Sequence, residues 1–91
     1  MAKVVVTLKI MPESPDVDLD NLQKKVLKKI RDAFGDTETK VEREAIGFGL
    51  NALKILFVMD ENKKTETLEN SIREIEEVQS VDVVDVRRAI G

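Results

Sequence analysis

The chain has 91 residues, which is the size of one domain and enough for a single hydrophobic core. It contains no cysteine and no histidine, which excludes disulfide bonds, thiolate and imidazole chemistry, and most zinc or copper sites. A net charge of −3 and the lack of Trp and Tyr disfavour nucleic-acid binding by charge or by base stacking. No apolar run approaches the roughly 18 residues that a membrane span needs. Because the N-terminus also has no signal-peptide layout, we expect a cytoplasmic protein with residues 1–91 as one domain.

The first predicted element is a strand over residues 4–10, because apolar residues occupy every second position. Pro12 and Pro15 are expected to end this strand, with a loop over residues 11–17. An amphipathic helix follows, because apolar residues then recur at spacings of three and four. Those residues are Leu19, Leu22, Val26, Ile30 and Ala33. Asp18 is the predicted N-cap of the helix and Gly35 its end.

The second half of the chain predicts two strands, a helix and a final strand. Residues 37–46 are rich in charge and suit a strand at a sheet edge, whereas residues 50–59 are nearly all apolar and suit a central strand. A second helix is predicted from Leu68, Ile72 and Ile75, with Thr65 or Thr67 near its N-cap. The Val-rich segment over residues 78–88 closes the chain as a strand.

This order of elements predicts an α+β, ferredoxin-like βαββαβ fold. Its four-stranded antiparallel sheet has the order 4-1-3-2, so the two most apolar strands, the first and the third, are central. Each helix has one apolar stripe, so both are expected on one face of the sheet. The open face would then carry Lys54, Leu56 and Val58 of the third strand.

The turn Gly47-Phe48-Gly49 is the first candidate site, because its glycines give unusual backbone freedom around an aromatic residue. One interpretation is a tight hairpin whose Phe folds back on the core. The other is an aromatic anchor for a pocket in a partner protein.

Arg87 and Arg88 are the second candidate site. They are either a solvated strand end or a basic probe aimed at phosphate or carboxylate groups. We expect the predicted topology to place Phe48 and Arg88 at one end of the molecule, within reach of one partner. The loops over residues 12–15 and 60–64 are expected at the opposite end.

The sequence offers no catalytic, cofactor or metal site. Helix capping and solvated surfaces explain the acidic clusters better than metal binding does; these clusters are Asp16, Asp18 and Asp20, and Glu74, Glu76 and Glu77. The serines have no histidine to act as a base, and no glycine-rich phosphate loop is present. We therefore expect neither an enzyme nor a protein that binds nucleotide by itself.

Three segments resemble the exchange-factor domain of the elongation factor 1-beta family, in its archaeal form. They are residues 11–18, residues 46–50 and residues 78–83, the last followed by a basic tail. The resemblance implies a ferredoxin-like fold and GDP release from the GDP-bound form of the GTPase elongation factor 1-alpha. It also implies that Phe48 packs into the GTPase and that Arg88, or else Arg87, reaches toward the GTPase magnesium site.

Two other classes of function are open to this fold. A ferredoxin-like RNA-binding module would need aromatic residues on the central strands and a basic face. The first strand has no aromatic residue, and Phe57 of the third strand is expected on the core face. A regulatory or oligomerisation module would act through the open face of the sheet.

Overall fold

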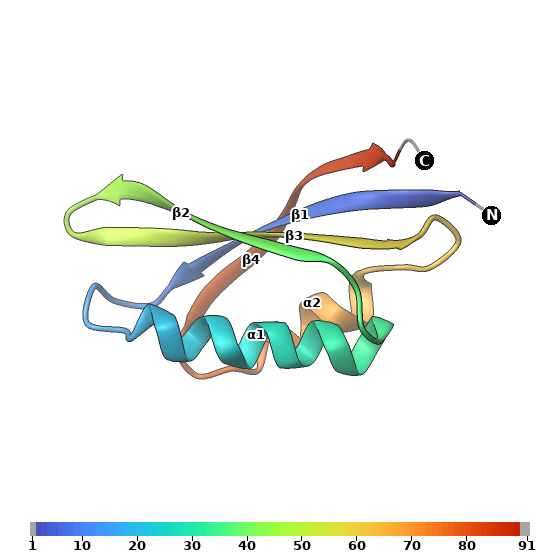
Figure 1. The fold of residues 1–91 in the computed structure, drawn as a ribbon. Coiled ribbons are helices and arrows are strands. Elements are labelled where there is room, and N and C mark those ends of the chain that lie inside the picture. Colours follow the sequence, from blue (N-terminus) through green and yellow to red (C-terminus); the bar gives the residue numbers. More distant parts are fainter. Residues whose placement is uncertain (1, 90–91) are drawn as a thin grey trace.

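Six elements follow one another in the predicted order, and the computed structural model describes residues 2–89 of the chain (Figure 1). They are β1 (Lys3–Pro12), α1 (Leu19–Phe34), β2 (Thr39–Gly47), β3 (Leu50–Asp60), α2 (Glu66–Arg73) and β4 (Val78–Arg88). The predicted α+β, ferredoxin-like fold is confirmed. β4 has its predicted bounds, whereas β1 continues to Pro12, which pairs with Val78 after a register shift.

The sheet has the order β2-β3-β1-β4, and each pair of neighbours is antiparallel. The apolar strands β1 and β3 are therefore central, as their composition predicts. Both helices lie on one face of the sheet (Figure 1). Leu8, Ile55 and Phe57 are fully buried under the helices, while Leu56 and Val58 lie on the other face and stay partly exposed.

The helix ends confirm the predicted caps. The Asp18 carboxylate accepts hydrogen bonds from the backbone N–H groups of Asp20 and Asn21, at 3.0 and 3.3 Å, so the start of α1 is satisfied. Gly35 ends α1 with a φ of 77°, which few residues other than glycine adopt. Thr65 is the N-cap of α2, and its hydroxyl donates to Glu69 at 2.8 Å.

The turn between β2 and β3 stands at the end of a two-stranded arm. The described pairing of β3 with β1 covers Leu53 to Asp60. The first residues of β3, from Leu50 to Ala52, therefore pair with β2 alone. An ion pair between Arg43 and Asp20 ties the arm to α1. A Cβ built on Gly49 would lie 3.6 Å from Pro15, so the loop after β1 packs closely under the turn.

Strand directions decide which loops share an end of the molecule. β3 and β4 are both antiparallel to β1, so they run parallel to each other and finish at the same end. Ion pairs mark that end: Lys3 lies 3.1 Å from Asp60, and Arg88 lies 3.5 Å from Glu61. The β2–β3 arm projects from the other end of a molecule 42 Å long (Figure 1).

The prediction that Phe48 and Arg88 share one end is therefore wrong. It treated β4 as finishing where β3 begins, although two strands that are both antiparallel to the strand between them must finish together. The placement of the loops is corrected as well. The residue 12–15 loop lies near the arm, and the residue 60–64 loop lies beside Arg88.

Candidate functional site

Phe48 projects into solvent from the tip of the arm. Its relative exposure is 101%, so the interpretation that it folds back on the core is wrong. The backbone explains the projection: φ is 53° at Phe48 and 79° at Gly49, and a type I′ hairpin turn requires positive φ at both of these positions. Gly47, with a φ of 122°, turns the chain into this conformation.

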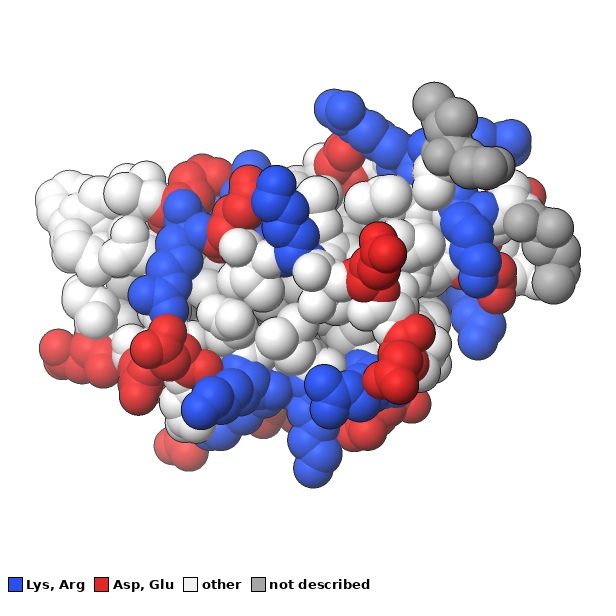
Figure 2. All heavy atoms as spheres, viewed as in Figure 1, with Lys and Arg blue, Asp and Glu red and all other residues white. Residues whose placement is uncertain are grey.

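Ile46 adds a second exposed apolar residue to the tip. A register shift between Ala45 and Gly47 leaves Ile46 out of the ladder, with an exposure of 41%. Figure 2 shows uncharged side chains at the upper left of the view, where the arm ends, with acidic side chains directly below them. Sequence analysis did not select Ile46 as a site residue, because strand alternation gives no sign of a bulge.

Arg87 and Arg88 lie at the other end, on opposite faces of the sheet. Arg87 pairs in register with Val5 on the open face, and its Nε lies 2.8 Å from the Asp85 carboxylate. Arg88 pairs with Val4 on the helix-covered face, and its Nη2 lies 3.5 Å from Glu61. Both arginine side chains are about 80% exposed.

A groove of about 340 Å³ lies beside Arg88 on the helix-covered side of the sheet. Its apolar lining comes from Val4, Val6, Met59 and Val86, and Glu61 lies at its margin. The 8 residues of α2 rise about 1.5 Å each and the 11 residues of β4 about 3.3 Å each, so the helix is much shorter than the strand and leaves the end of β4 uncovered. Val86 is consequently 55% exposed. This groove was not predicted from the sequence, although the short second helix was a signal for it.

The open face of the sheet combines apolar and charged side chains. Glu44 of the edge strand β2 lies 3.4 Å from the ammonium groups of Lys9 and Lys54 on the two central strands. Hydrogen bonds from Lys54 and Lys9 lower the pKa of the Glu44 carboxyl from its usual 4.5. Thr7 and Leu56 lie next to this cluster, and Val5 and Val58 form the following pair on the open face, toward the arginine end of the sheet.

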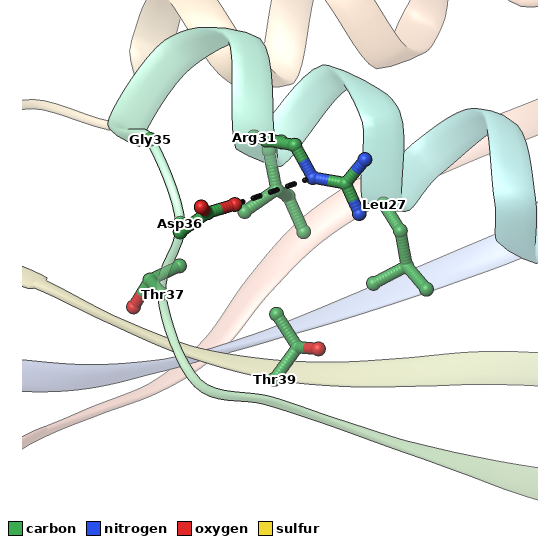
Figure 3. A pocket seen from close by; sticks show the side chains of 7 residues that line it. Leu27, Arg31, Gly35, Asp36, Thr37 and Thr39 are labelled. Carbon is green, nitrogen blue, oxygen red and sulfur yellow. Dashed lines mark ion pairs between the residues drawn. The ribbon is translucent and has the colours of Figure 1, made fainter.

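The hollow in Figure 3 lies where α1 passes into β2. Arg31 and Asp36 face each other across its rim, with Nε and Oδ1 3.6 Å apart. Its volume of about 80 Å³ is far below the roughly 300 Å³ at which ligand pockets begin. The hollow contains none of the candidate site residues, and we assign it no ligand.

Within residues 2–89, no three His, Cys, Asp or Glu residues come together as a metal site would require. Among the helices described, neither has the length and apolar character that crossing a membrane demands. Asp18 and Asp20 instead serve in the helix cap and in the ion pair with Arg43.

Comparison with known proteins adds a family. The EF-1 guanine nucleotide exchange domain matches residues 5–89. Elongation factor 1-beta of Methanosphaera stadtmanae is 45% identical over 89 residues, which cover 97% of this chain and 98% of that protein. The proteins of the same name from Methanothermobacter thermautotrophicus and Natronomonas pharaonis are 45% and 39% identical, covering 97% of this chain and 98% and 99% of their own lengths.

A solved structure, the de novo designed protein Foldit4, aligns with a TM-score of 0.63 over 98% of each chain. At 23% identity it shows likeness of fold alone. The family match and the relatives extend along almost the whole chain, in agreement with the resemblance predicted from the sequence. The chain belongs to the EF-1 guanine nucleotide exchange domain family.

Proposed function

We propose that this protein is a guanine nucleotide exchange factor that promotes GDP release from the GDP-bound form of elongation factor 1-alpha. The observation that carries the proposal is the family match over residues 5–89. The protein would act by binding and by charge, without covalent chemistry, cofactor or metal of its own. Neither nucleic acid nor a membrane enters the proposed reaction.

In this proposal Phe48 is the docking anchor. Its full exposure supports the role, because an aromatic ring in water gains apolar burial when it enters a partner pocket. Gly47 and Gly49 hold the backbone that presents it. Removal of such an anchor typically weakens binding by about 2 kcal/mol, or roughly 30-fold.

Arg88 is the proposed probe of the GTPase magnesium site. A GTPase holds GDP partly through a magnesium ion, and a cation brought to that site repels the metal strongly where the dielectric is low. The exposed guanidinium at the end of β4 supports this role, and Arg87, on the opposite face of the sheet, is the alternative. Because Phe48 and Arg88 lie at opposite ends, the factor would have to lie lengthwise along its partner.

The test is stopped-flow measurement of fluorescent GDP leaving the cognate elongation factor 1-alpha. Arg88→Ala should lower the maximal rate with little change in the half-saturating concentration of factor, because the cation acts after the complex has formed. Arg88→Lys should keep much of the activity, because a point charge suffices against a metal ion. Raised magnesium should slow the reaction.

Arg87→Ala is the matched control in this experiment. A wild-type maximal rate for Arg88→Ala, together with a crippled Arg87→Ala variant, would transfer the role to Arg87. Wild-type rates for both variants would reject a metal-site role for this end of the sheet.

A second candidate is a regulatory or oligomerisation module that acts through the open sheet face. The partly exposed Val5, Leu56 and Val58 on that face favour it. Gel filtration with and without elongation factor 1-alpha separates the two functions. Self-association without the GTPase would favour the module, and a one-to-one complex would favour the exchange factor.

A further inference from the structure

Arg88 forms an ion pair with a neighbouring carboxylate at the end of β4. Its Nη2 lies 3.5 Å from Oε2 of Glu61, which follows β3. The Glu61 backbone is fixed, because its N–H donates to Ala2 O at 3.1 Å. The turn closes through a hydrogen bond from Lys63 N–H to Asp60 O, at 3.0 Å. The carboxylate therefore projects from an anchored turn.

We propose that Glu61 is a positioning residue for Arg88. It holds the guanidinium against the turn between β3 and α2, and it offsets part of the positive charge until a partner draws the guanidinium away. This inference rests on the proposed exchange function, because Glu61 would regulate that function through Arg88.

The direction of the effect follows from charge. A cation that competes with a metal ion acts through its positive field, and a carboxylate beside it reduces that field. The Arg88 and Glu61 side chains are 79% and 44% exposed, so water and salt screen their attraction and the contact can be exchanged. Neutralisation of Glu61 should therefore release Arg88 and speed nucleotide exchange by about 1.4- to fivefold, the range of an exposed ion pair.

The neighbouring pair of Arg87 and Asp85 provides an internal comparison. Its atoms are 2.8 Å apart, and it lies on the open face of the sheet, away from Glu61. If Arg88 is the probe, release of Arg87 by Asp85→Asn should not raise the exchange rate. Glu66→Gln is a further control, because it removes one negative charge from the margin of the same groove.

The experiment measures GDP release with Glu61→Gln in the wild-type and Arg88→Ala backgrounds. The expected result is a raised maximal rate in the wild-type background, an unchanged half-saturating concentration, and no change when Arg88 is absent. Glu66→Gln should match wild type. An unchanged rate for Glu61→Gln in an active chain, or acceleration by Asp85→Asn instead, overturns the inference.

A second readout needs no GTPase. In the free protein, Glu61→Gln should shift the NMR signal of the Arg88 Nε–H group, and Glu66→Gln should leave it in place. An unmoved signal also overturns the inference. Failure of the unmodified chain to release GDP is a different result, since it rejects the proposed function whatever the NMR signal shows.

Discussion

Phe48 occupies a backbone conformation that its side chain does not favour. A φ of 53° is left-handed, and for an ordinary L-residue this region costs about 1–2 kcal/mol. Asn or Gly would fit the same turn at less cost. Because Phe48 is also fully exposed, it contributes no core packing that could offset the strain. A binding role accounts for an aromatic residue here better than stability does.

Phe48→Asn should therefore separate binding from folding. We expect a thermal midpoint equal to or above that of wild type, because Asn tolerates positive φ. The half-saturating concentration for GDP release should rise by roughly 30-fold, the effect of a lost anchor. Thermal melting and the exchange titration measure the two quantities.

Phe57→Ala is the contrasting variant, because Phe57 is fully buried and stacks on Phe34 with ring centroids 5.4 Å apart. It should lose about 3–5 kcal/mol of stability. A Phe48→Asn variant that melts early and exchanges normally while folded would show that Phe48 is a structural residue.

The edge strand β2 is attached to the sheet partly by charge. Its inner partner β3 supplies the ladder hydrogen bonds, and Glu44 reaches across β3 to Lys9 on β1. The carboxylate thereby links three strands on the open face. Because the Glu44 side chain is 40% exposed, solvent screens the link, which assists the ladder rather than replacing it.

The pH dependence of Glu44→Gln should reveal this link. The pKa of Glu44 is lower in the folded chain than its usual 4.5, so the carboxylate binds protons more weakly when folded. Its stabilisation is complete above that usual value and is lost as the pH falls through the folded pKa. Urea unfolding should find Glu44→Gln less stable than wild type at pH about 7 and equal to it in strong acid.

Glu42→Gln is the matched control, because Glu42 lies on the same strand and face, in register with Lys54. Its free energy of unfolding should differ less from that of wild type at neutral pH than that of Glu44→Gln does. If Glu44→Gln stays less stable than wild type at low pH, the lost stability comes from packing and not from charge.

At the scale of the whole molecule, the two candidate contacts are separated by the length of the sheet. Their free-energy contributions should therefore add, since residues without shared neighbours couple by less than about 0.5 kcal/mol. The Phe48→Ala, Arg88→Ala double variant should combine the two single effects. Its half-saturating concentration should be as high as that of Phe48→Ala, and its maximal rate should be as low as that of Arg88→Ala. A double-variant cycle in GDP release measures this, and strong coupling would argue against independent contacts.

The protein alone should bind neither GDP nor magnesium tightly. The sequence contains no glycine-rich phosphate loop, and residues 2–89 bring no three metal-ligating side chains together. Calorimetric titration with each ligand should show no micromolar binding. A saturable heat signal that gives micromolar affinity for GDP or for magnesium would contradict the expectation.

The fold was predictable because local and global signals agree. The alternation in β1 and the apolar run in β3 require both strands to be central, and this requirement selects the sheet order. The position of Arg88 relative to Phe48 was predicted wrongly, although the predicted antiparallel order already determines it, because β3 and β4 both run antiparallel to β1.

Other parts of the candidate site could not be deduced from sequence. The exposure of Phe48 depends on positive φ at a residue type that rarely adopts it. The contact between Glu61 and Arg88 joins residues far apart in the chain, and no spacing rule connects them.

The two-stranded arm also has a consequence for hydrogen exchange. Between Leu50 and Ala52 the arm pairs only within the hairpin, and a hairpin alone is marginally stable in water. Its further contacts are the exposed ion pair of Arg43 with Asp20 and the packing of the turn on Pro15. Its amide protons should exchange by local fraying, whereas those in the middle of β1 should exchange only through global opening. Phe48 is therefore carried by a segment that can change its orientation while the core stays folded. Docking would then slow amide exchange in the arm more than anywhere else in the sheet.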